Sequence, residues 1–168
     1  MRYFFFGSLR DADVLGLVLG RRLPPARLRP ARLKGFRLLR VRGESYPMLA
    51  AASARTVRGA LVHGLTGADA KRLAFFEGEE YETAPLMVVL GARRRVRALV
   101  FRARSGLAGD GRAWSFAAWR RNAKRAFLPL ARLWMAFYRH ADPASAEALW
   151  RKRRQHGLAA ALRGFHEK

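Results

Sequence analysis

Two short segments of the sequence carry residues whose types suit anion binding and acid–base chemistry. The first is Phe6-Gly7-Ser8-Leu9, in which a glycine follows an aromatic run and precedes a helical pattern. Glycine lets the backbone turn sharply, and the amide groups beyond it can face a carboxylate or another anion. Because such turns more often have a purely structural role, this segment predicts an anion-binding turn only in combination with a second signal.

The second segment is acidic. Residues 77–82 hold four of the 12 acidic residues of the chain. Within this segment, Glu77 follows two phenylalanines at the expected end of a helix, and apolar neighbours would desolvate its carboxyl group and raise its pKa. A carboxylate in that setting can accept and return a proton, which predicts a catalytic role for Glu77. The alternative interpretation is a solvated helix end that balances nearby arginines.

Other kinds of chemistry find little support in the sequence. There is no cysteine, so the chain contains neither disulfides nor thiolate nucleophiles. The four histidines share no metal-ligand spacing, and Ser8 lacks the glycine-x-serine-x-glycine setting of a hydrolase nucleophile. No phosphate-loop or dinucleotide-binding pattern is present. We therefore expect neither a metal nor a cofactor.

The two candidate segments lie in a pattern of strands and helices typical of the α+β class. Aromatic and β-branched runs predict strands, and glycine near residue 35 predicts a bulge. Serine or threonine followed three residues later by aspartate has the spacing of a helix cap. We expect strands over residues 2–6, 31–42, 56–65, 81–90 and 96–104, and helices that begin at Ser8 and at Thr66.

The C-terminal part of the chain has a helical pattern, unlike the strand-rich part before it. Residues 105–110 form a glycine-containing loop, which divides a domain of residues 1–105 from a helical extension of residues 106–168 that we expect to pack on it. Aromatic residues recur at helical spacing from Phe116 to Phe137, and Pro129 is expected to kink or divide that helix. A last helix is expected from Asp142 to about Gly164.

The net charge of +22 raises the question of a nucleic-acid partner. Arginine outnumbers lysine 29 to 5 and the basic residues are spread along the chain, so we expect incidental polyanion binding and no specific nucleic-acid function. The longest apolar stretch, residues 126–138, is interrupted by proline and arginine and is too short to span a membrane. These features predict a soluble, cytoplasmic protein of unknown oligomeric state.

Taken together, the two segments resemble motifs of the γ-glutamylcyclotransferase superfamily. Phe6-Gly7-Ser8-Leu9 resembles its Tyr-Gly-Ser/Thr-Leu motif, and Phe76-Glu77-Gly78 followed by Tyr81 resembles its Phe-Glu-Gly…Tyr motif. The segments 46–49 and 57–61 look like its middle strands. The resemblance extends over about residues 2–103 and includes the γ-glutamylamine cyclotransferase and avirulence-induced-gene branches.

The resemblance implies a small, mostly antiparallel barrel-like sheet with flanking helices, and an activity that needs no cofactor. The α-amine of a γ-glutamyl amine or peptide would attack its own γ-carbonyl, which forms 5-oxoproline and releases an amine. By the same resemblance, Glu77 would be the acid–base residue. The substrate would be held by the following residues: Phe6, Gly7, Ser8, Leu9, Tyr46, Pro47 and Tyr81.

One departure from the family motif leaves other functions open. Phe6 stands where the motif has tyrosine, and Tyr3 is not placed to supply the missing hydroxyl group. A non-catalytic module that binds a small anion or a partner protein on the same fold is therefore one alternative. The other is a protein that associates with polyanions through its basic tail, residues 110–168, which contains the run Arg151–Arg154.

Overall fold

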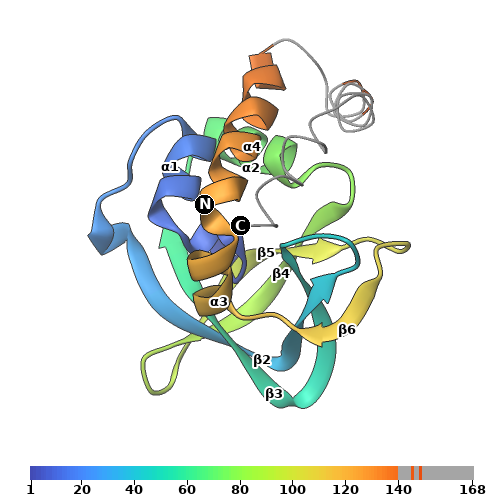
Figure 1. Ribbon diagram of the computed structural model, residues 1–168. Helices are drawn as coiled ribbons and strands as arrows, with labels where there is room; N and C mark the ends of the chain where they lie inside the picture. The colour runs from blue at the N-terminus through green and yellow to red at the C-terminus, as the bar shows by residue number, and fades with distance from the viewer. Residues whose placement is uncertain (140–144, 146–147, 149–168) are drawn as a thin grey trace.

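A computed structural model describes residues 1–139, 145 and 148 of the chain. Six strands form one sheet in the order β3-β1-β5-β4-β2-β6, and a further pairing of β3 with β2 closes five of them into a barrel (Figure 1). The strands are β1 (Arg2–Phe5), β2 (Leu28–Val41), β3 (Pro47–His63), β4 (Tyr81–Leu90), β5 (Arg94–Ala103) and β6 (Gly109–Ala113).

The sheet is mixed and mostly antiparallel, as predicted. Only the pairing of β1 with β5 is parallel among the strand pairs of the described residues. The long pair of β2 and β3 shifts register between Lys34 and Phe36, at the expected bulge. Gly35 has a φ of 84° there, a left-handed conformation that glycine adopts without strain. The α+β barrel with flanking helices is thus confirmed.

The aromatic run of β1 separates two hydrophobic cores. Because successive side chains of a strand point to opposite faces, Phe4 and Phe6 join a cluster with Leu33 and Val88, which lie on β2 and β4. Tyr3 belongs to a second cluster, formed against the helices. Burial of both faces explains why this strand has no polar alternation.

One glycine permits β1 to approach β3. A Cβ atom at Gly59 would lie 2.4 Å from both Phe4 Cζ and Phe5 O, so a larger residue would push the two strands apart. The close approach keeps the ring of Phe4 fully buried in the barrel.

Helices α1, α2 and α4 pack together on one side of the barrel, where Figure 1 shows them grouped. The α-helices are α1 (Ala12–Leu19), α2 (Gly67–Glu77), α3 (Phe116–Asn122) and α4 (Lys124–Ala136). Three short 3-10 turns are η1 (Ser8–Arg10), η2 (Pro25–Arg27) and η3 (Phe137–Arg139). No helix of the described residues is long and apolar enough to cross a membrane.

The first helix begins later than the sequence predicts. Ser8 lies in η1, and the cap of α1 is Asp11, whose carboxylate accepts from the backbone amides of Asp13 at 3.0 Å and Val14 at 3.5 Å. The prediction of a cap at Ser8 is wrong because the chain is still extended at Asp11, so only the later carboxylate can reach the first helical amides.

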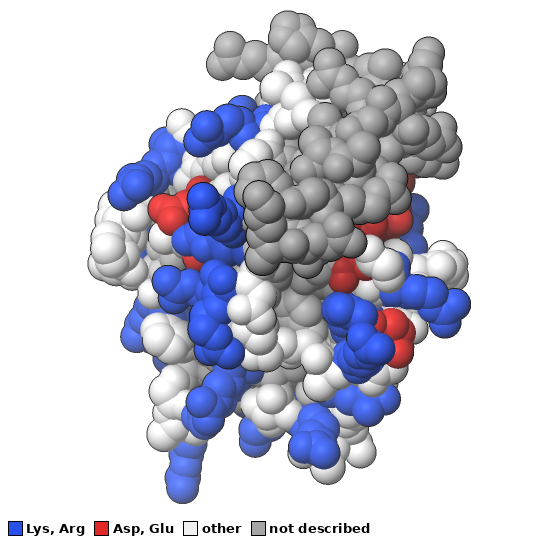
Figure 2. Space-filling model, in the orientation of Figure 1, with Lys and Arg blue, Asp and Glu red and all other residues white. Residues whose placement is uncertain are grey.

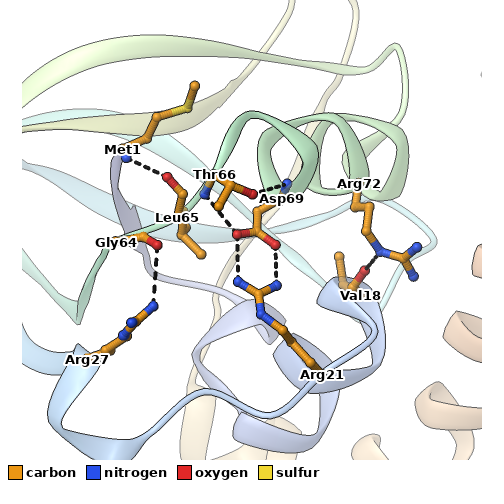
Figure 3. A network of polar contacts seen from close by, with 9 residues as sticks. All are labelled: Met1, Val18, Arg21, Arg27, Gly64, Leu65, Thr66, Asp69 and Arg72. Carbon is orange, nitrogen blue, oxygen red and sulfur yellow. Dashed lines mark hydrogen bonds and ion pairs between the residues drawn. The ribbon is translucent and has the colours of Figure 1, made fainter.

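The second helix begins where it was predicted to begin. Thr66 and Asp69 form a complete capping box, in which each side chain accepts from the backbone amide of the other. Figure 3 shows Arg21 reaching both carboxylate oxygens of Asp69, and Arg72 of α2 donating to the carbonyl of Val18 at 2.5 Å. The Arg72 bond joins α2 to α1, and the Arg21 contacts join α2 to the residues that follow α1.

Residues 109–113 form a strand where the sequence predicts a loop followed by helix. This strand, β6, pairs with the end of β2, and the buried Val41 opposite Gly109 marks the contact. The division of the chain at residue 105 stays a prediction, as does the helix expected from Asp142 to Gly164, which lies outside the described residues together with the basic run 151–154.

The aromatic stripe of the C-terminal part is divided at Ala123 and not at Pro129. Ala123 has φ −116° and ψ −26° and separates α3 from α4, whereas Pro129 lies inside α4. Lys124, the first residue of α4, forms ion pairs with Asp11 at 2.8 Å and Asp13 at 2.7 Å. The break at Ala123 lies directly before these ion pairs. Docking onto α1 therefore sets the position of the break.

Candidate functional site

The glycine turn contacts the first residue of β3. A Cβ atom at Gly7 would lie 3.0 Å from Cγ and 3.1 Å from Cδ of the buried Pro47, so a side chain there would have to displace the proline ring. The turn closes on itself, since the amide of Arg10 donates to the Gly7 carbonyl at 3.1 Å. The amides of Ser8 and Leu9 make no hydrogen bond to any residue that the structure describes.

Tyr81, at the start of β4, connects Pro47 to the acidic segment. Its buried hydroxyl group donates to the Pro47 carbonyl at 3.2 Å. Desolvation by burial raises the pKa of Tyr81 strongly, and the negative charge of Glu77 raises it further. The phenol therefore stays protonated over the ordinary pH range.

Glu77 ends helix α2 in a setting that disfavours its charged form. The side chain is half-buried, yet its carboxyl group is surrounded by enough protein that desolvation raises the pKa to about 8. Its place at the helix C-terminus acts in the same direction, because the helix dipole repels an anion there. Among residues 1–139, no side chain or amide donates a hydrogen bond to this carboxylate.

The sharp turn after Glu77 follows from Gly78. This residue has a φ of 70°, and its amide donates to the carbonyls of Ala74 and Phe75 at 3.1 and 3.2 Å. The helix therefore stops at Glu77, and only three residues separate it from the start of β4. The tight connection keeps Glu77 beside Tyr81.

Tyr46 lies on the other side of the acidic segment. Its hydroxyl group contacts Glu80 Oε2 at 3.4 Å, and both residues make further interactions. Glu44 and Glu80 also raise the pKa of Tyr81, which places three carboxylates around one phenol in a chain of strongly positive charge. The structure thus gathers the acidic residues where the sequence placed the catalytic segment.

Phe6, the residue that departs from the family motif, lies inside the barrel. It is 6% exposed and belongs to the barrel cluster with Leu49 and Val88. A phenylalanine ring carries no polar atom, so Phe6 offers no hydrogen-bonding group to the turn. Of the predicted site residues, Gly7 lies against Pro47, Pro47 accepts a hydrogen bond from Tyr81, and the charge of Glu77 acts on the phenol of Tyr81.

Two tryptophans, Trp134 and Trp114, contact the segments that carry Glu77 and Tyr46. Trp134 of α4 donates from Nε1 to the Phe75 carbonyl at 3.2 Å and stacks on the Phe75 ring at 5.2 Å between centroids. Trp114 donates from Nε1 to the Ser45 carbonyl at 2.8 Å, next to Tyr46. The helical spacing of the aromatic residues predicts the apolar face to which Trp134 belongs, whereas Trp114 precedes α3 and the bonds made by both indole nitrogens depend on the tertiary fold.

The described residues contain no group of three or more histidine, aspartate or glutamate side chains that could hold a metal ion. What the site offers instead is one protonatable carboxyl group, unpaired turn amides and a phenol with a fixed donor direction. Such a set can move a proton and hold an anion.

Comparison with known proteins places this chain in a family. A family model described as gamma-glutamyl cyclotransferase, AIG2-like, matches residues 3–121. The chain therefore belongs to the AIG2-like family of gamma-glutamyl cyclotransferases. It is 28% identical over 130 residues to AIG2-like protein A of Arabidopsis thaliana, a match that covers 74% of this chain and 75% of the relative.

A further relative and two solved structures agree with that assignment. Protein AIG2 B of Arabidopsis thaliana is 26% identical over 149 residues, covering 86% of this chain and 85% of the relative. The solution structure of an Arabidopsis thaliana protein superposes with a TM-score of 0.59 at 25% identity, over 84% of this chain and 93% of that one. A structure named gamma-glutamyl cyclotransferase gives a TM-score of 0.53 at 10% identity, over 79% and 86%, and shows the shared fold alone.

Proposed function

We propose that this protein is a γ-glutamylcyclotransferase that converts a γ-glutamyl amine or peptide into 5-oxoproline and a free amine. The observation that carries the proposal is the juxtaposition of Glu77 and the glycine turn through Tyr81 and Pro47. The two parts of the proposed site are a carboxyl group with a raised pKa and turn amides that have no partner within the described part of the chain. This pairing suits a substrate that carries both an ammonium group and a carboxylate.

In the proposed reaction, Glu77 takes a proton from the α-ammonium group of the substrate. The freed amine nitrogen attacks the γ-carbonyl carbon, a new ring C–N bond forms, and the bond to the leaving nitrogen breaks. Glu77 then returns the proton to that nitrogen. The second proton, which the attacking nitrogen loses as it becomes the ring amide, also passes to the released amine, which leaves as an ammonium group, so the reaction needs no water and no cofactor. Because amine and carbonyl belong to one molecule, holding them in the reactive geometry supplies much of the rate enhancement.

The raised pKa of Glu77 suits both halves of this cycle. A carboxyl group with a pKa of about 8 is a stronger base than an ordinary glutamate, and it is protonated readily when it must act as an acid. The bound ammonium group of the substrate would lower this pKa, since a nearby positive charge favours the carboxylate. Binding of the correct substrate would therefore generate the base.

The substrate carboxylate would bind at the glycine turn, with Ser8 and Leu9 donating their unpaired amides. Pro47, Tyr46 and Tyr81 would form the walls of the pocket. Because the Tyr81 hydroxyl group is committed to the Pro47 carbonyl, its role is to fix the position of the β3 start and to exclude water from Glu77.

The decisive experiment measures 5-oxoproline release from a panel of γ-glutamyl amines and peptides. Glu77→Gln is expected to lower kcat by about 10²- to 10⁴-fold, because glutamine cannot accept the proton. Glu79→Gln is the matched control, since Glu79 is an exposed neighbour two residues away, and it should retain activity. Turnover that survives in Glu77→Gln would remove the mechanism.

A binding module without catalysis is the second candidate, and the burial of Phe6 favours it. The family motif tyrosine is replaced by a ring that packs wholly in the barrel, so the turn has no hydroxyl group at this position. This candidate predicts that 5-oxoproline or a γ-glutamyl compound binds stoichiometrically in calorimetry with no product formed over hours. Product formation by the unaltered chain decides against it.

A further inference from the structure

A cavity of about 520 Å³ lies between the start of β2, the later part of β3 and the end of β4, and Glu77 is not among its lining residues. Its lining includes four arginines, Arg10, Arg29, Arg32 and Arg58. The remaining lining residues are small or apolar, and none is acidic. A volume of this size suits a small ligand.

Two of these arginines are held by neutral partners. Arg32 donates to the Gly91 carbonyl at 2.5 Å, and the Arg10 guanidinium lies 4.2 Å from the centroid of the Phe116 ring. Burial lowers the pKa of Arg10, in a group that remains charged at neutral pH. Neither contact neutralises the positive charge, so the two guanidinium groups are oriented but not compensated.

The other two arginines, Arg29 and Arg58, are exposed at the same cavity. Across the described part of the chain, none of the four has a carboxylate within ion-pair distance, although six other basic residues do. The described ion pairs therefore lie elsewhere, and the charged side chains that line this cavity are all positive.

The register of the sheet makes this charge costly in the absence of an anion. Arg32 and Arg58 are direct partners in the antiparallel pairing of β2 with β3. Like charges at opposed positions repel and destabilise the strand pair. An anion bound between them would remove this penalty.

We infer that the cavity is a binding site for a small anion that carries two or more phosphate groups, such as a diphosphate. Guanidinium groups bind phosphate oxygens through paired hydrogen bonds, and four of them exceed what one carboxylate can neutralise. The apolar floor formed by Pro30 and Val89 would face the less polar part of the ligand. None of the residues proposed to bind or convert the substrate lines this cavity, although Arg10 belongs to the same 3-10 turn as Ser8 and Leu9.

A small ligand fits the geometry better than a nucleic-acid strand. Single-stranded nucleic acid is usually bound in a groove whose aromatic side chains stack on the bases. Here the arginines converge on a hollow whose lining contains no aromatic residue. The wide spread of basic side chains over the molecular face in Figure 2 would add a weaker, salt-sensitive attraction for any polyanion.

The test is calorimetric titration of the full-length protein with inorganic pyrophosphate, with citrate as an anion of similar charge. Pyrophosphate is expected to bind at one site and at least tenfold more tightly than citrate. Arg29→Ala combined with Arg58→Ala should weaken pyrophosphate binding by about a hundredfold, at about tenfold for each charged hydrogen-bonding group. Arg58→Lys, which keeps the charge but loses the paired donors, should give an intermediate loss.

The matched control removes two exposed arginines of β5, Arg95 and Arg97, which do not line the cavity. This control has the same net charge as the cavity variant, and it should bind pyrophosphate as the unaltered protein does. Equal losses in both double variants would overturn the proposal in favour of diffuse charge. Equal affinity for citrate would also overturn it, as would cavity-dependent binding of a single-stranded oligonucleotide without binding of pyrophosphate. Thermal unfolding checks that each variant folds.

Glu77→Gln separates this inference from the proposed catalytic function. The variant should bind pyrophosphate with unchanged affinity, because Glu77 is not part of the cavity. Loss of pyrophosphate binding in Glu77→Gln would show that the two sites are one and would refute the assignment.

Discussion

Helix α2 carries a carboxylate at each end, and their surroundings shift the two pKa values in opposite directions. Asp69, in its first turn, is 2% exposed and is bonded by both nitrogens of Arg21 and by the Thr66 amide. Its pKa falls to about 2, first because of the Arg21 hydrogen bond. Glu77, about 12 Å further along the axis, has its pKa raised to about 8 by desolvation.

The difference shows how one helix can supply both a structural and a chemical carboxylate. At the N-terminus, the helix dipole and the capping amides stabilise the anion, so Asp69 stays charged and holds α2 against the segment that contains Arg21. At the C-terminus, the dipole is unfavourable, and no donor of the described residues compensates for burial. An acid that is neither paired nor fully solvated is the kind of group that can exchange protons with a substrate.

The largest contrast should appear in turnover. Glu77→Gln is expected to reduce kcat/KM for a γ-glutamyl substrate by about 10²- to 10⁴-fold, whereas Asp69→Asn should change it by less than about threefold in the folded protein. In the unaltered enzyme, kcat/KM should rise with pH up to about 8, as Glu77 loses its proton. A flat profile from pH 6 to pH 9 would contradict the role of Glu77 as base.

In contrast to turnover, the free energy of unfolding should fall when Asp69 is replaced. Asp69→Asn removes the anion that Arg21 and Thr66 bond, and it is expected to lower the free energy of unfolding at pH 7 by about 2 kcal/mol. Since the folded pKa of Asp69 lies below its ordinary value of 3.8, this stabilisation is present above pH 3.8 and is lost as the pH falls toward 2. Denaturant titrations of both proteins at pH 7 and pH 2.5 measure it, and an equal difference at both values would refute it.

Glu77 should destabilise the fold at high pH. Because burial raises its pKa from 4.5 to about 8, the folded protein holds its proton more tightly than the unfolded chain does. Stability therefore falls as the pH rises from 4.5 to 8. Glu77→Gln is expected to be more stable than the unaltered protein by about 2 kcal/mol at pH 9 and about equal to it at pH 4. Urea unfolding at the two pH values gives the comparison, with Glu79→Gln unchanged at both.

The smallest effect concerns the support of the Glu77 end by α4. Trp134→Phe removes the bond from Nε1 to the Phe75 carbonyl and should cost about 1 kcal/mol more than the change in ring size alone. Trp119→Phe is a matched control, since the buried Trp119 Nε1 has no hydrogen-bond partner in the described structure. Equal changes in the free energy of unfolding would mean that the Trp134 bond contributes nothing.

Local patterns predicted most of the strands and the start of α2. The capping box at Thr66 and Asp69 and the bulge at Gly35 depend on residues within a few positions of one another. The cap at Asp11 was missed although its bonds to Asp13 and Val14 are local, because the chain stays extended past Ser8, the earlier candidate. The helix break at Ala123 lies beside a contact between distant segments. Asp11 receives Lys124 from more than a hundred residues away, and no local pattern reports that contact.

The candidate site was predictable as two segments but not as a site. Motif resemblance identified Gly7 and Glu77, whereas only the fold shows that Pro47 fills the space beside Gly7 and accepts from Tyr81. The arginine cavity had no local signal either. Arg32 and Arg58 are 26 positions apart, and only the pairing of β2 with β3 brings them face to face.

The sequence by itself determined where the chain turns, caps a helix and alternates its side chains, because steric limits and hydrogen bonds act between near neighbours. Tertiary structure decided which carboxylate is paired and which is desolvated, and which arginines share a cavity. Those outcomes depend on closure of the barrel by β2 with β3 and on the parallel contact of β1 with β5. Burial and charge are properties of the assembled surroundings of a residue, so they arise only when distant segments meet.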